Sequence, residues 1–167
     1  MEPEKIVQVL DELAQQARNE ESVYRVALAE ADGLALTAFT VSRAVQCRAR
    51  AKQLEGIALL YRHGRKPIGH PFVPFLRAGK WLSTLGQRRD DMEIVELCNR
   101  QNDAALRAYE SALRLPLPGT LRKALNNQLA TISDCYRGLL CLRRQLGQRA
   151  EHAKTVAMQA SLQASGT

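Results

Sequence analysis

Apolar and polar positions alternate along this chain with helical spacing in its first half. Between residues 3 and 30, and again between residues 34 and 63, small or apolar side chains recur every three or four positions. The first segment has this spacing at Ile6, Leu10, Leu13, Ala17, Tyr24 and Ala27. The second has it at Ala44, Cys47, Ala51, Leu54, Ala58 and Tyr61. Such spacing is typical of amphipathic helices, so we expect two long helices joined at residues 31–33.

Two further segments have the same pattern. Asp90 and Asp91 suit the start of a third helix, because carboxylates stabilise helix N-termini. Its inner stripe is Val95, Cys98, Asn102, Ala105, Tyr109 and Ala112. After a rigid turn at residues 115–119, a fourth helix has its stripe at Leu121, Leu125, Gln128, Ile132, Cys135, Leu139 and Leu142. We therefore predict a four-helix bundle over residues 1–147, followed at 148–167 by a polar C-terminal tail or a helix extension.

The segment between the second and third helices has a different character. Over residues 64–89, glycine and proline are interleaved with large apolar side chains, including Phe72, Phe75 and Trp81. This is too long for a tight turn and too apolar for a flexible linker. We predict an ordered crossover with a short helix near residues 75–85, which places the third helix parallel to the second. The three aromatic residues either cover the side of the bundle or form an exposed patch for self-association or a partner.

Composition supports one globular domain without a membrane span. The chain has 167 residues, of which 46% are hydrophobic and 25% charged, close to the average for globular proteins. Its longest apolar runs fall far short of the ~20 residues that cross a bilayer, and the polar start does not resemble a signal peptide. We therefore expect a cytoplasmic location, where the four cysteines stay free thiols.

The net charge of +7 raises the question of nucleic acid. Basic residues gather around positions 43–52, 62–66 and 143–149, but acids occur in every helical segment and no aromatic binding platform accompanies the basic groups. The clusters are therefore interpreted as solvated surface, and nucleic acid is not an expected partner.

Signatures of catalysis are missing from the sequence. It contains no glycine-rich phosphate loop, no G-x-S-x-G and no H-E-x-x-H motif, which are the local arrangements that support common enzyme chemistries. The histidines, His63, His70 and His152, fall outside the apolar stripes. We expect a protein that is not an enzyme and that has no cofactor.

Several short motifs in order resemble a known family. They are LDEL at 10–13, NEE at 19–21, YRHG at 61–64, AGKW at 78–81, DAAL at 103–106, and Gln128 four residues before Ile132. Over about residues 5–143 the chain thus resembles an uncharacterised bacterial family of ferritin-like four-helix bundles, a domain of unknown function. The resemblance implies a bacterial cytoplasmic protein with a ferritin-like fold and a link to stress.

The sequence departs from the di-iron ligand pattern of ferritin-like proteins. Such sites need an inward Glu from two helices and Glu-x-x-His from the other two. Residues 33–54 contain no Asp, Glu or His, and their interior is predicted to offer Gln46, Cys47 and Ala49. Residues 121–146 contain Asp134 as their one acid and no His. We therefore predict that no iron pair is held here.

A zinc site is a second metal hypothesis. With the second and third helices parallel, Cys47 and Cys98 stand at similar heights, and Cys135 with Glu20 or Glu21 reaches the same layer. Three thiolates and a carboxylate suit tetrahedral zinc, and the candidate set is Glu21, Cys47, Cys98 and Cys135. Alternatively, the small cysteines simply fill a narrow layer of the bundle.

The sequence leaves three functional hypotheses. The favoured one is a non-catalytic bundle that acts through protein–protein interaction or self-association. The second is a bundle that binds a metal (zinc or iron) or a small molecule in a bacterial stress response, and the third is a basic protein that associates with nucleic acid.

Overall fold

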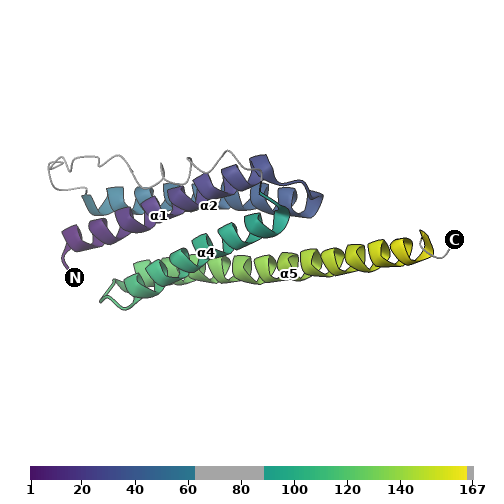
Figure 1. Cartoon of the computed structure of the whole chain (residues 1–167). Helices are drawn as coiled ribbons and strands as arrows, with labels where there is room; N and C mark the ends of the chain where they lie inside the picture. The colour runs from purple at the N-terminus through teal and green to yellow at the C-terminus, as the bar shows by residue number, and fades with distance from the viewer. Residues whose placement is uncertain (63–88, 165–167) are drawn as a thin grey trace.

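The computed structural model describes residues 1–62 and 89–164. These ranges form four α-helices and contain no strand: α1 (Pro3–Glu30), α2 (Leu34–Arg62), α4 (Asp91–Leu113) and α5 (Gly119–Ala164) (Figure 1). The predicted all-α four-helix bundle is confirmed. The short helix expected near residues 75–85 lies outside the described residues, as do Phe72, Phe75 and Trp81.

The start of α4 is tied to the turn between α1 and α2. One carboxylate oxygen of Asp91 accepts a hydrogen bond from the backbone N–H of Asp32, and the other accepts one from Gly33, both at 3.0 Å. A Cβ on Gly33 would stand 2.7 Å from this carboxylate, so a larger residue would have to push the Asp91 side chain away from its present position. Because α2 and α4 begin at the same end, they run in the same direction, and α1 and α5 run opposite to them.

Short-range sequence signals set the helix ends. Pro3 occupies the first turn of α1, where its missing N–H costs nothing. Asp90 and Glu93 form a reciprocal capping box at the start of α4, which satisfies two otherwise unpaired backbone donors. Between α4 and α5, the Arg122 guanidinium donates to the carbonyl oxygens of Leu113 and Leu115 at 2.7 Å each and fixes the turn.

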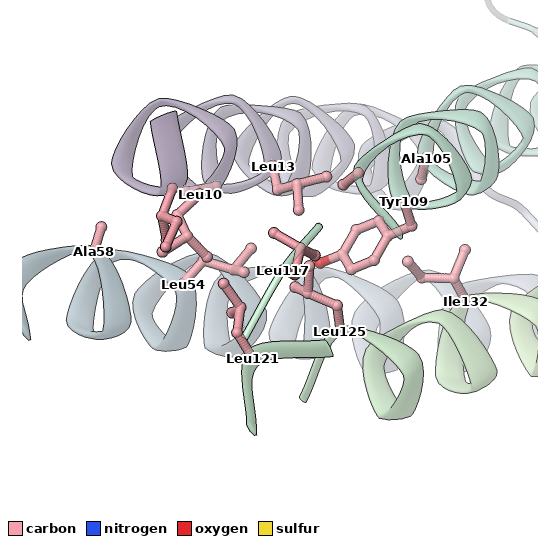
Figure 2. Close-up of a cluster of buried hydrophobic side chains, with 13 residues drawn as sticks. Leu10, Leu13, Leu54, Ala58, Ala105, Tyr109, Leu117, Leu121, Leu125 and Ile132 are labelled. Carbon is pink, nitrogen blue, oxygen red and sulfur yellow. The ribbon is translucent and has the colours of Figure 1, made fainter. Parts of the chain in front are cut away.

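The end of the bundle where α1 begins has a hydrocarbon core, which we call the apolar cluster (Figure 2). Its buried members are Ile6, Leu10, Leu13, Ala14, Leu54, Ala58, Ala105, Tyr109, Ala112, Leu117, Leu121, Leu125 and Ile132. A second buried cluster lies toward the other end, with Ala27, Leu36, Ile94, Val95 and Leu139 among its members. The helices pack most extensively between α1 and α2.

The last part of α5 leaves the bundle. The helix continues past Gly147 to Ala164, so residues 148–164 are a helix extension and not an irregular tail (Figure 1). Every residue from 148 to 161 is exposed. Within the described ranges, no helix is long and apolar enough to cross a membrane.

Candidate functional site

Charged, thiol and other polar side chains gather in the bundle interior beyond the apolar cluster, in what we call the polar layer. It comprises Glu20 and Tyr24 from α1, Arg43, Cys47 and Arg50 from α2, Cys98 and Asn102 from α4, and Cys135 from α5. All are buried. Four of them, Tyr24, Cys47, Cys98 and Cys135, also belong to the second buried cluster. Because buried polar groups are costly unless they find partners, the contacts of each one decide what the layer can do.

An ion pair between α1 and α2 is the strongest interaction of the layer. The Arg50 guanidinium lies 2.6 Å from Oε2 of Glu20, and the exposed fractions of the two side chains are 6% and 0%. Arg50 also lies over the ring of Tyr109, with 5.8 Å between the guanidinium carbon and the ring centre, a cation–π geometry. Burial raises the pKa of the Glu20 carboxyl, although Arg50 opposes this. Burial is the largest single influence on Arg50 and lowers its pKa, but Glu20, Cys47 and Tyr109 together outweigh it, so the pKa is raised overall.

Two of the three buried thiols, those of Cys47 and Cys135, belong to this network as weak hydrogen-bonding groups. Cys47 Sγ lies 3.7 Å from both the Glu20 carboxylate and Arg50 Nη2, and the Tyr24 hydroxyl lies 3.3 Å from Cys135 Sγ. Burial, reinforced by neighbouring acidic groups, raises the pKa of Cys47 and of Cys98 to about 12. The pKa of Cys135 is also raised, again chiefly by burial. At neutral pH these cysteines are therefore protonated and unreactive.

Arg43 and Asn102 are buried with polar atoms left over. Arg43 donates through Nη1 to Gln46 Oε1 at 2.6 Å, but its Nε and Nη2 have no hydrogen-bond partner among the described residues. The same holds for both amide atoms of the fully buried Asn102 and for Oε1 of Glu20. Such atoms are rare in native interiors, so the layer has an unused capacity for hydrogen bonding.

The zinc candidates are only partly brought together. Cys47, Cys98 and Cys135 are all buried, but the inward carboxylate is Glu20. Glu21 lies at the edge of the bundle, where it pairs with Arg25 and Arg48 at 2.9 Å each. Among the residues that the structure describes, no three His, Cys, Asp or Glu side chains are grouped so that they could hold a metal ion. The geometry gives the zinc hypothesis no support.

The interior of α2 differs from the prediction. Gln46 and Ala49 are exposed, whereas Arg43 and Arg50, which were assigned to a solvated basic cluster, are buried. The spacing contained the signal, because both arginines fall three or four residues from Cys47 on the inward stripe. Glu20, on the facing helix, supplies the counter-charge that makes burial of Arg50 acceptable.

The exposed part of α5 is a second candidate site. Its small residues Ala150, Ala153, Ala157 and Ala160 follow Leu146 at alternating steps of four and three. In a helix these positions lie on one face, the same face that Leu139 presents to the bundle interior. The inward stripe of the bundle thus continues along a segment that no other described helix covers.

A shallow groove opens between the end of α2 and the start of α5. It has a volume of about 350 Å³ and is lined by Ile57, Leu60, Tyr61, Thr120, Leu121 and Ala124. Its lining is mostly apolar and brings no charged groups together, unlike typical small-molecule sites with convergent polar groups.

No protein-family model matches the sequence, and no significantly similar protein was found among curated proteins.

Proposed function

We propose that this protein is a non-catalytic helical bundle that acts through self-association, with the exposed end of α5 as its interface. The observation that supports this proposal is that residues 148–161 form regular helix while every one of them is exposed. Isolated helices of ~12–15 residues are marginal in water, so a helix of this length outside a bundle gains much from a packing partner.

The shape of the exposed face favours another helix as the partner. Alanine dominates the stripe that continues from Leu146, and small side chains allow two helix backbones to approach closely. The alternating steps of four and three are the spacing by which helices pack along a shared seam. Val156, 51% exposed, lies beside this stripe and adds apolar area to it.

A second copy of the chain is the occupant that fits best. A patch that pairs with itself about a two-fold axis gives a closed dimer, the commonest form of oligomer. Residues 148–161 contain Arg149, Glu151 and Lys154, so their net charge is only +1 (two bases, one acid). Repulsion between two copies of this segment is therefore small, even though the whole chain carries +7.

Paired substitutions in the full-length protein test this proposal. Ala153→Glu with Ala157→Glu places two carboxylates on the stripe, whereas Gln148→Glu with Thr155→Glu places the same charge on the opposite face. We expect the wild type and the second variant to be dimers by sedimentation velocity at ~100 µM, and the first to be a monomer. A monomeric wild type, or equal behaviour of the two variants, contradicts the proposal.

The family resemblance adds further proposals about context. Membership of the ferritin-like family, a bacterial origin, a cytoplasmic location and a link to stress all derive from the motifs between residues 5 and 143.

A further inference from the structure

We propose that the polar layer binds one small planar monoanion, of the carboxylate or nitrate type, at the free edge of the Arg43 guanidinium. This inference is independent of the self-association proposed above. It depends on three features of the layer: the orientation of the unused donors, the balance of buried charge, and the size of ligand that such a position admits.

The unused donors of Arg43 lie on one edge of its guanidinium. Nη1 is already bonded to Gln46 at 2.6 Å, whereas Nε and Nη2 are buried and unpartnered within the described chain. The N–H groups on Nε and Nη2 point the same way and are spaced to meet two oxygen atoms of a carboxylate. A planar oxyanion satisfies both donors at once, which a spherical ion cannot do.

The charges of the layer do not balance without such an ion. Two guanidiniums, Arg43 and Arg50, face a single carboxylate, Glu20. The thiols supply no negative charge, because burial raises the pKa of Cys47 and Cys98 to about 12. The layer therefore has one excess positive charge, and a buried charge without a partner is strongly unfavourable. One monoanion neutralises it, whereas a dianion would leave an excess of the opposite sign.

The surroundings also restrict the ligand. The Asn102 amide, fully buried and one helical turn from Cys98, offers an unpartnered donor in the same layer. Arg43 is only 6% exposed, and the layer adjoins the apolar cluster and shares four residues with the second buried cluster. A carboxylate attached to a protein cannot reach this depth without opening the bundle, so the ligand is a free small ion.

One competing arrangement uses the same atoms. Oε1 of Glu20 is also buried and unpartnered, so a rotation of Arg43 onto Glu20 would give an Arg–Glu–Arg group without any ligand. The two arrangements differ in their response to anions, because only the first makes the stability of the folded state depend on the anion concentration.

Thermal unfolding of the full-length protein at constant ionic strength distinguishes them. Sodium formate, acetate or nitrate would replace sodium chloride stepwise. For wild type we expect a rise in melting temperature of about 3–6 °C at ten times the dissociation constant, with formate and nitrate at least as effective as the bulkier acetate. The absence of any rise, or a response to sulfate as strong as to formate, overturns the proposal.

Matched variants separate binding from general salt effects. Arg43→Met removes both the paired N–H donors of the guanidinium and the excess positive charge. Arg43→Lys keeps the charge but lacks the paired donors. Arg48→Met is the control, because Arg48 is 53% exposed on the same helix. We expect the formate response to be lost in Arg43→Met, weakened in Arg43→Lys and unchanged in Arg48→Met. An equal response in all three contradicts the proposal. If Arg43→Met does not fold, the comparison of Arg43→Lys with Arg48→Met decides.

Discussion

The apolar cluster and the polar layer use opposite kinds of interaction in the interior of the same bundle. Around Leu10, Leu54 and Leu125, the helices pack hydrocarbon against hydrocarbon, and the side chains are fully buried. About three helical turns further along α1, at Glu20, the same four helices enclose an ion pair, three thiols and three more polar side chains, all of them buried. The side chains of both regions are buried, but only the polar layer consists of groups that are more favourably placed in water.

This difference indicates where stability and where function reside. Burial of hydrocarbon is favourable by about 25 cal/mol per Å² and needs no precise partner, so the apolar cluster stabilises the fold. A buried ion pair seldom improves on a hydrophobic substitute. A layer of charged and thiol groups therefore has a stability cost that the apolar cluster offsets, and it is the region in which we expect binding.

The largest expected difference within the chain is in thiol reactivity. Cys47 and Cys98, with pKa values of about 12 in place of 9.0, have about a thousandfold less thiolate at pH 8 than ordinary cysteines, and Cys135 is shifted in the same direction. Cys141 is exposed. Titration of the native protein with a thiol-specific disulfide reagent should show one fast thiol, and four in guanidinium chloride.

Cys141→Ser should abolish the fast phase of that titration. Two or more fast thiols in the native protein would show that the polar layer is open to solvent, and would remove the contrast between its cysteines and the exposed one.

The next largest effect is the loss of the buried cation at Arg50. Arg50→Met should lower the free energy of unfolding by about 3–5 kcal/mol at pH 8, because Glu20 is left without its closest counter-charge. The pKa of Glu20 is already raised above 4.5 by burial and should rise further. A carboxyl group whose pKa is raised on folding contributes fully to stability below its unfolded-state pKa, here 4.5. This contribution is lost as the pH rises through its pKa in the folded state. The cost of Arg50→Met should therefore shrink toward pH 5, as measured by urea unfolding.

Leu125→Ala is the matched control in the apolar cluster. This substitution should lower the free energy of unfolding by about 2–5 kcal/mol, through lost burial and the cavity that remains. The loss should be the same at pH 5 and at pH 8. Cys47 is also a titratable neighbour of Glu20, and with its pKa raised to about 12 it stays protonated over this range. A pH-independent cost for Arg50→Met would show that Glu20 stays ionised without its partner.

The smallest effect should come from the boundary between the two regions. The Tyr109 hydroxyl donates to Gln128 Oε1 at 2.5 Å, and Gln128 Nε2 donates to Gln53 Oε1 at 2.8 Å. Tyr109→Phe keeps the ring and removes the donor, so the loss should be about 1 kcal/mol. Gln53→Ala, farther along the same chain of hydrogen bonds, should cost less in the same denaturant titration.

Local signals in the sequence were enough for the helices but not for the polar layer. Pro3, Asp90 and the turn at residues 115–119 act on their immediate neighbours, so the helix boundaries could be predicted from short windows. The interior position of Arg50 depends on Glu20, thirty residues away on another helix, and no window around Arg50 contains that information. Glu20 and Glu21 are adjacent acids, and only the packing of α1 on α2 distinguishes the buried one.

The extension of α5 is another feature that could not be predicted from the sequence alone. Its alanine and glutamine content fitted either a tail or more helix, and the sequence left both open. The structure extends the helix to Ala164, because nothing after Gly147 interrupts the backbone hydrogen bonding that the bundle has already nucleated.

By itself, the sequence determined that this protein is a bundle of long helices, because the period of its apolar residues is a property of neighbours in the chain. The tertiary structure alone decided which charged side chains are buried, which thiols burial keeps protonated, and where the inward stripe of α5 becomes exposed to solvent. Those outcomes depend on the free energy of desolvation and on counter-charges from other helices, which arise only when distant segments pack together.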